Sequence, residues 1–259
     1  MKCGTKLTFN TENDEVVKFK TYHYNISEHY KYIHKNIFYK MWSFITYRLI
    51  ATPLAFVYYK IINPVKFVNK KVLKQCKNNG YFIYANHTNQ FGDAFCPALI
   101  CFPKKPYVIV NPDNIAMPFL GRCLKMWGAI PTPNTINASK NFNIAIKHHL
   151  KHNNPILIYP EAHLWPYYTK IRNFPSTSFR YPVKLNKPVY CFTTIYKRKK
   201  FSKKPRTEIY IDGPFFIDTS IPEKEAQHKL RNEIYTQMKQ RSLLSNYNYV
   251  SYIKRSEND

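Results

Sequence analysis

Residues 81 to 97 read Tyr-Phe-Ile-Tyr-Ala-Asn-His-Thr-Asn-Gln-Phe-Gly-Asp-Ala-Phe-Cys-Pro. The first five residues are apolar or aromatic, which predicts a buried β-strand that ends before Asn86. His87 therefore lies at the carboxyl end of this strand, and Asp93 follows after a polar turn. In an α/β protein a histidine at this position, with a carboxylate nearby, is suited to act as a general base. The alternative is an ordinary loop histidine, one of nine in the chain.

Strand patterns alternate with helical patterns along the rest of the chain. Further strands are expected at 106–111, 127–131, 155–159, 188–196 and 207–211, and helices at 94–101, 118–126, 138–152 and after Pro222. This alternation predicts an α/β fold with a largely parallel central sheet flanked by helices. We expect one α/β domain over residues 66–259. The arm 1–27 is expected to be irregular, the basic stretch 197–204 a solvated turn, and the polar tail frayed.

The segment from residue 41 to 62 is strongly apolar and aromatic, but Arg48, Pro53 and Lys60 interrupt it. A membrane-spanning helix needs about 20 predominantly apolar residues, a central charge is costly, and a proline splits or kinks a helix. We therefore expect residues 1–65 to form an arm and a membrane-associating helical segment, with two short helices in the bilayer interface. The alternatives are a helical hairpin on the protein's own core and a spanning helix.

The composition is strongly basic: 40 Lys and Arg residues face 15 Asp and Glu residues, a formal net charge of +25. Such a charge attracts polyanions, namely nucleic acid, an anionic membrane surface or an acidic carrier. Because the basic residues are spread along the chain without a recognised motif, nucleic acid is not expected as a partner.

Two other classes of site are not indicated by the sequence. Six glycines provide neither a dinucleotide fingerprint nor a Walker-type loop. Six scattered cysteines include no Cys-x-x-Cys pair and no cleavable signal precedes them, so we expect reduced thiols, no metal site and a cytoplasmic location.

Four sequence blocks occur in a recognisable order and spacing. They are Asn86-His87 with Asp93, Gly121-Arg122 through Gly128-Ala129-Ile130, Ile158-Tyr159-Pro160-Glu161, and Lys187-Pro188-Val189. Over residues 80 to 194 they resemble the phospholipid/glycerol acyltransferase family, typified by 1-acylglycerol-3-phosphate acyltransferases. The resemblance implies transfer of a fatty acyl group from a thioester, acyl-CoA or acyl carrier protein, to a lysophospholipid or glycerol-phosphate hydroxyl, without a further cofactor. It also implies a peripheral or monotopic protein on the cytoplasmic side of a membrane.

The resemblance also implies roles for single residues. His87 is expected to be the general base, and Asp93 to orient it and stabilise the imidazolium. Glu161 is expected to bind hydroxyls of a polar acceptor, with a structural hydrogen bond to a neighbouring loop as the alternative. His163 either donates to a phosphate or supports its loop. Backbone amides near Asn86 or in the turn 128–132 are the candidates for an oxyanion hole.

Three positions depart from the family pattern. Five residues separate His87 from Asp93 where the family has four, so Asp93 reaches His87 only if the turn bulges, with Gly92 as the suitable place. Asn134 and the stretch Ala162-His163-Leu164 replace the usual phosphate-binding arginines.

Nearby cations are expected to take over the phosphate contacts, because Arg can grip a phosphate in bidentate fashion. The candidates are Arg172 and Arg180, then Lys170, with Lys184 also near. The competing interpretation is a non-catalytic protein of the same fold that binds lipid surfaces. A serine hydrolase is disfavoured because no Gly-x-Ser-x-Gly elbow is present.

Overall fold

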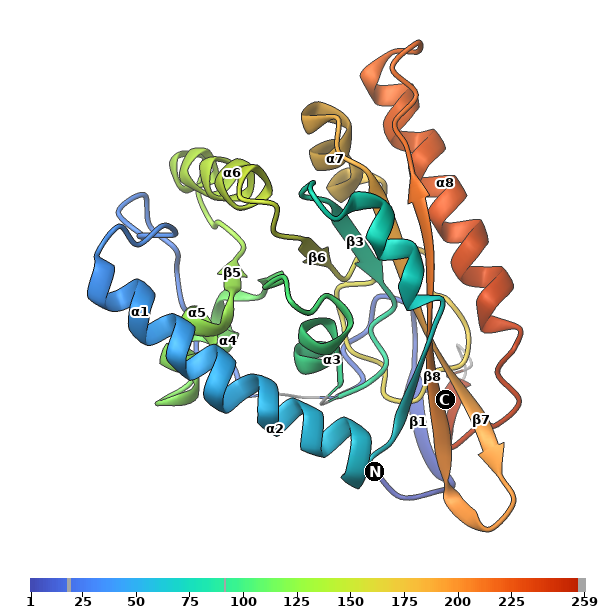
Figure 1. The fold of residues 1–259 in the computed structure, drawn as a ribbon. Helices are drawn as coiled ribbons and strands as arrows, with labels where there is room; N and C mark the ends of the chain where they lie inside the picture. Colours follow the sequence, from blue (N-terminus) through green and yellow to red (C-terminus); the bar gives the residue numbers. More distant parts are fainter. Residues whose placement is uncertain (18–19, 91, 256–259) are drawn as a thin grey trace.

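The computed structural model describes residues 1–17, 20–90 and 92–255. Its centre is a seven-stranded sheet with the spatial order β2-β8-β7-β3-β6-β4-β5 (Figure 1). Its strands are β2 (Val65–Val68), β3 (Phe82–Ala85), β4 (Tyr107–Val110), β5 (Ala129–Pro131), β6 (Ile156–Ile158), β7 (Val189–Lys199) and β8 (Ser202–Phe215). β7 and β8 pair antiparallel, whereas the other neighbours in this sheet are parallel. The expected α/β fold with a largely parallel sheet is confirmed.

β3 lies in the middle of this sheet and is buried on both faces. Phe82 and Tyr84 belong to one hydrophobic core, and Ile83 and Ala85 to the other. This division follows from strand geometry, because successive side chains point to opposite faces. The apolar residues 81–85 therefore hold the end of β3 in a fixed position between the two cores.

Helices cover the sheet, as expected. They are α3 (Gly92–Ile100), α4 (Pro112–Ala116), α5 (Leu120–Trp127), α6 (Ile136–Lys151), α7 (Arg180–Leu185) and α8 (Glu223–Ser242), with 3₁₀ turns at Lys70–Cys76 and Thr177–Phe179. α8 buries Ala226, Leu230, Ile234 and Met238, which are four residues apart and so lie on one helix face. This face packs against β7.

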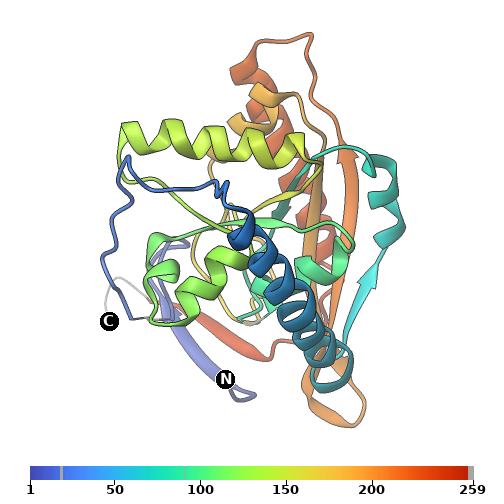
Figure 2. The same cartoon turned by 60° about the vertical axis from the view of Figure 1, so that its left-hand side comes forward.

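Residues 37–62 form one continuous helical rod, here called the N-terminal helical run (Figures 1 and 2). It consists of α1 (Ile37–Ile45), a wider turn (Thr46–Ala51), α2 (Thr52–Val57) and a second wider turn (Tyr58–Ile62). The expectation of two separate helices is wrong. In the first wide turn the backbone N–H of Thr52 donates to the Tyr47 carbonyl five residues back, which lets the helix accommodate Pro53 at its next position.

The two sides of the N-terminal helical run differ in their surroundings. Tyr47, Ala51, Ala55 and Tyr59 are buried at a spacing of four residues, whereas Phe38, Leu49, Leu54 and Ile61 are among many exposed apolar residues. Within the described residues, no helix combines the length and the apolar character needed to cross a bilayer. The rod thus rests on the protein through one face and carries a large apolar surface on the other.

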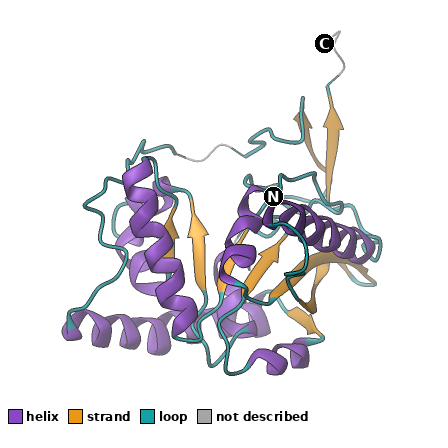
Figure 3. Cartoon of the chain, turned by 90° about the horizontal axis from the view of Figure 1, so that it is seen from above, coloured by secondary structure: helices purple, strands orange, loops and turns teal. Residues whose placement is uncertain are grey.

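Both ends of the described chain form strands, contrary to expectation. β1 (Thr5–Phe9) pairs in parallel with β9 (Val250–Lys254) in a separate two-stranded sheet (Figure 3). The rings of Phe9 and Tyr252 pack on Trp165, at centroid distances of 4.8 and 5.0 Å. Each strand is short and only half-buried, and it forms through its pairing with the other. The expectation of a frayed tail is therefore wrong for residues 250–254, and that of an irregular arm is wrong for residues 5–9, whereas the described residues 10–17 and 20–27 form no helix or strand.

The basic stretch 197–204 is a turn only at its tip. β7 extends to Lys199 and β8 begins at Ser202, which leaves Lys200 and Phe201 as the loop. Strand pairing continues so far because Glu208 lies between Lys197 and Arg206 and forms ion pairs with both, at 3.1 and 2.6 Å. The acidic residue offsets the repulsion between the two cations across the strands.

Candidate active site

The chain leaves β3 through Asn86, whose side chain is locked to the neighbouring strand. Its Nδ2 donates to the Thr194 carbonyl (3.0 Å), and its Oδ1 accepts from the Thr194 N–H (2.8 Å). Asn86 is 1% exposed. The amide therefore continues the β3–β7 hydrogen bonding by one residue and fixes the backbone from which His87 emerges.

His87 and Asp93 form the expected pair. The ring Nδ1 lies 2.7 Å from Asp93 Oδ2, and the same oxygen accepts from the backbone N–H of Asn89 (3.0 Å). Burial raises the pKa of the Asp93 carboxyl, while the hydrogen bonds from His87 and Asn89 oppose that rise. The His87 side chain is 25% exposed and that of Asp93 8%. No described residue hydrogen-bonds His87 Nε2, so this nitrogen is the one a substrate could meet.

The turn before α3 absorbs the extra residue between His87 and Asp93. Asn89 closes it, since its Oδ1 accepts from the Gly92 N–H and its carbonyl from the Asp93 N–H, both at 3.0 Å. A Cβ on Gly92 would lie 1.9 Å from the Asn89 amide nitrogen. A larger residue at position 92 would therefore displace the Asn89 side chain that closes this turn.

Tyr159 supports the pair from the adjacent strand. Its ring stacks on His87 with a centroid distance of 4.4 Å, and its hydroxyl donates to the Asp93 carbonyl (2.6 Å). Tyr159 directly follows β6, which pairs with β3 in the register Tyr84↔Ile158. We did not predict it as a site residue. The available signal was its place at the carboxyl end of a strand beside β3, where α/β proteins gather functional side chains.

Glu161 is buried and holds the backbone of His87. Its Oε2 accepts from the His87 N–H (3.1 Å) and its Oε1 from the Arg172 N–H (2.9 Å). Burial raises the pKa of Glu161, and the Arg172 guanidinium and both backbone donors act against it. In this structure Glu161 makes the structural hydrogen bond that was the alternative expectation, and its carboxylate does not face solvent.

Arg172 is 1% exposed, so it does not reach an open site. Its guanidinium pairs with Glu161 (3.2 Å), donates to the carbonyls of Glu12 and His163, and lies 4.8 Å from the Trp165 ring centroid. The expected contact between Arg172 and a substrate phosphate is therefore not the arrangement seen. The physical reason is that Glu161 has no other cation against it in the described structure.

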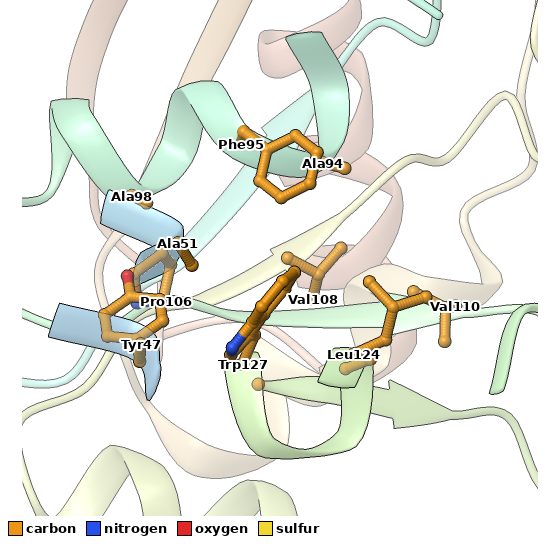
Figure 4. A pocket seen from close by; sticks show the side chains of 12 residues that line it. Tyr47, Ala51, Ala94, Phe95, Ala98, Pro106, Val108, Val110, Leu124 and Trp127 are labelled. Atoms are coloured by element: carbon orange, nitrogen blue, oxygen red, sulfur yellow. The ribbon is translucent and has the colours of Figure 1, made fainter. Parts of the chain in front are cut away.

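An apolar hollow begins one residue beyond Asp93 (Figure 4). Side chains of α3, β4, α5 and the N-terminal helical run line a small hollow of about 70 Å³, or about 540 Å³ when the open space in front of it is counted. Those used in the argument below are Ala94, Phe95, Ala98, Ala51, Val108 and Trp127. The hollow could not be read from the sequence, because its walls come from four separate segments.

Comparison with known proteins identifies the architecture. No protein-family model and no curated protein matches the chain. Five solved chains match the structure, among them the crystal structure of the 1-acyl-sn-glycerophosphate (LPA) acyltransferase PlsC from Thermotoga maritima, with 13% sequence identity. The match covers 81% of this chain and 89% of that chain, with a TM-score of 0.55. The chain has the PlsC fold.

The remaining predicted cations lie apart from the His87–Asp93 pair on this PlsC fold. Lys170 and Lys184 are exposed. Arg180 is exposed on α7 and donates to the Tyr181 hydroxyl (3.0 Å). His163 is half-buried, and only its carbonyl takes part in the Arg172 contacts described above. Among the described residues, none of these side chains contacts the pair.

Asn134, which stands at the position of a family arginine, has a structural contact. Its Oδ1 accepts from the Ile26 N–H at 2.8 Å and so anchors the N-terminal arm. The structure thus links His87, Asp93, Glu161 and Arg172 into one cluster. Asn134 and His163, which lie in the stretches that replace the family's arginines, make contacts that hold the fold together.

Proposed function

We propose that this protein is a membrane-associated O-acyltransferase that moves a fatty acyl group from a thioester to a lysophospholipid or glycerol-phosphate hydroxyl. The observation that carries the proposal is the 2.7 Å contact between His87 Nδ1 and Asp93 Oδ2, at the carboxyl end of a central strand in the PlsC fold. The acyl donor is acyl-CoA or acyl carrier protein, and no further cofactor is needed for the chemistry.

The reaction follows from the two ring nitrogens of His87. Asp93 holds the proton on Nδ1, which leaves Nε2 as the base. Nε2 takes the proton of the acceptor hydroxyl as its oxygen attacks the thioester carbonyl, a contribution of roughly 10²- to 10⁴-fold in rate. The tetrahedral intermediate then expels the thiolate, which recovers that proton from the imidazolium. The products are an ester and a free thiol.

The apolar hollow supports a fatty chain as the transferred group. Ala94, which lines it, directly follows Asp93 in α3, and we place the hydrocarbon part of the acyl chain in this hollow. Each methylene that leaves water for such a site contributes about 0.8 kcal/mol.

The exposed apolar face of the N-terminal helical run supports membrane association. From the family resemblance we further propose a peripheral or monotopic protein on the cytoplasmic side. Its exposed apolar residues would lie in the interface, and the formal charge of +25 favours anionic lipid. For the acceptor phosphate we keep Lys170, Arg180 and His163 as proposed contacts on the family resemblance, and because none of them contacts the His87–Asp93 pair, the acceptor's head group would have to extend from the pair to reach them.

The test is acyl transfer by His87→Ala and Asp93→Asn, with labelled acyl-CoA or acyl carrier protein and a panel of lysolipids in detergent micelles. Both variants are expected to lose about 10²- to 10⁴-fold in kcat. His228→Ala, an exposed histidine on α8, is the matched control and should turn over like the wild type. A His87→Ala protein that stays folded and keeps its turnover would contradict the mechanism.

A second candidate function is a non-catalytic protein that binds lipid surfaces. The burial of Arg172 favours it, because the cation nearest the site does not face an acceptor. Absence of transfer from both donors to every lysolipid, with vesicle binding retained, would select this function.

A further inference from the structure

The long β7–β8 pair ends in a strongly basic projection, residues 197–206, here called the basic hairpin. The segment contains seven lysines and arginines and no acidic residue. Lys197 and Arg206 are engaged by Glu208 at its base. Among the described residues, Lys199, Lys200, Lys203 and Lys204 form no ion pair with a carboxylate. The outer half of the hairpin therefore carries uncompensated positive charge.

An aromatic side chain stands at the tip of the basic hairpin. Phe201 is 91% exposed, and the Lys200 ammonium lies 5.4 Å from its ring centroid. Exposing a large apolar ring on a projecting turn is unfavourable in water. Beside lysines it suits the boundary between lipid headgroups and acyl chains.

The basic hairpin projects beside the end of the N-terminal helical run. β2 starts three residues after that run and pairs in parallel with β8 in the register Val65↔Thr207. From this pair, the residues that precede β2 lead to Ile62, and the residues that precede Thr207 in β8 lead toward Phe201. At about 3.3 Å per residue the tip reaches roughly 20 Å beyond the pair. Figure 1 shows the end of the run and the hairpin at the same end of the molecule, and Figure 2 shows them close together in projection.

The two neighbouring surfaces have complementary character. The run ends in Ile61 and Ile62, which are 69% and 66% exposed, and the hairpin adds Phe201 and its lysines. One surface is apolar and the other is basic with an apolar tip, which is the combination that binds an anionic bilayer.

We propose that the basic hairpin is a second contact with an anionic lipid surface, with Phe201 inserted at the interface and its lysines on the phosphate headgroups. This inference rests on the proposed membrane association. An acidic carrier protein would also attract the lysines, but it gives no reason for the exposed phenylalanine or for the continuity with the apolar run.

The experiment measures partition of the full chain onto phosphatidylglycerol vesicles and onto phosphatidylcholine vesicles. K200Q/K203Q/K204Q should bind phosphatidylglycerol about a hundredfold more weakly, since each basic residue near an anionic surface contributes about fivefold. K140Q/K147Q/K151Q removes the same charge from exposed positions on α6, at the opposite end of the molecule (Figures 1 and 2), and should bind nearly as the wild type.

The role of the tip is tested with Phe201→Ala, which should lose about tenfold in partition because the ring no longer leaves water. Ile136→Ala removes an apolar side chain that is 84% exposed at the start of α6 and is the matched control. Thermal unfolding of each variant establishes that the fold is kept.

The outcomes separate the hairpin from the catalytic proposal. Hairpin variants that bind phosphatidylglycerol like the wild type would overturn the inference, and so would a wild type that binds neither vesicle. Normal vesicle binding with slower transfer from acyl carrier protein alone would assign the hairpin to the carrier instead. Acyl transfer in detergent micelles should be unchanged in all hairpin variants. If the wild type showed no acyl transfer in micelles, the proposed activity would be contradicted, but the proposed role of the hairpin in vesicle binding would not.

Discussion

Glu161 and Arg172 show how single residues hold His87 in place. The Glu161 carboxylate accepts from the backbone N–H of His87, and the backbone N–H of Trp165 donates to the His87 carbonyl at 3.0 Å. Both backbone polar groups of His87 are therefore hydrogen-bonded. Arg172 lies against both Glu161 and Trp165. Arg172, which the sequence suggests as a phosphate ligand, is thus buried in the structure and supports Glu161 and Trp165.

Arg172→Ala is predicted to destabilise the protein by about 3–5 kcal/mol, because it leaves the buried Glu161 without its cation. The measurement is the free energy of unfolding in urea. Arg180→Ala removes an exposed arginine and should change it by less than about 0.5 kcal/mol. If Arg172→Ala were equally stable and raised KM only for phosphorylated acceptors, Arg172 would be a substrate ligand after all.

Ala98→Leu is predicted to shorten the acyl chain that the protein accepts. Ala98 lines the hollow and is 7% exposed, so a larger side chain enters the space itself. Overpacking of a filled site costs about 1–3 kcal/mol, which corresponds to a fall of about 5- to 150-fold in kcat/KM for long donors. Short donors serve as the internal control. An unchanged ratio between long and short donors would place the chain elsewhere.

At the scale of elements, α6 is fixed to the sheet by an aromatic stack. His149 packs on Tyr107 of β4 with ring centroids 3.6 Å apart and is 8% exposed. Burial, aided by His148, Lys105 and His152, lowers the pKa of His149 to about 3. The folded protein therefore holds this imidazole neutral at pH values where an unfolded chain would protonate it.

The sign of the resulting pH effect follows from proton binding. Between its unfolded pKa of 6.5 and about 3, the unfolded state binds the proton and the folded state does not, so stability falls as the pH falls. His149→Phe keeps a ring on Tyr107 and should remove about 2 kcal/mol of the loss between pH 7 and pH 5. Urea unfolding at both pH values measures this. A variant with the wild-type slope would show that His149 is not the responsible group.

The elements that the sequence predicts are those with a local cause. β3 and β6 are short apolar runs buried on both faces, and α8 repeats an apolar residue every fourth position. The His87–Asp93 pair could be predicted for the same reason, since both residues lie in one turn. β1 and β9 could not, because each becomes a strand only through the other. The burial of Arg172 also depends on the distant Glu12.

For the whole molecule, the proposed membrane association combines the charge of +25 with the apolar surface of the N-terminal helical run. The expected consequence is a strong dependence of vesicle binding on salt. Electrostatic attraction extends over a Debye length of about 10 Å at 0.1 M salt and about 3 Å at 1 M. Binding to phosphatidylglycerol vesicles should fall by at least tenfold over this range, since several lysines contribute.

Sedimentation of vesicles over a series of salt concentrations tests this prediction. Phosphatidylcholine vesicles provide the control, because the apolar contribution alone should not weaken with salt. Equal salt dependence on both lipids would mean that the charge does not act through the anionic headgroups.

The pairing of β1 with β9 has a consequence for how the chain is made. The first strand leaves the ribosome early, yet its partner, residues 250–254, follows only after the whole sheet has been synthesised. Until then Trp165, whose backbone N–H donates to the His87 carbonyl, lacks the rings of Phe9 and Tyr252. A nascent chain that stops short of residue 250 would therefore carry the full central sheet and still lack a finished wall behind His87.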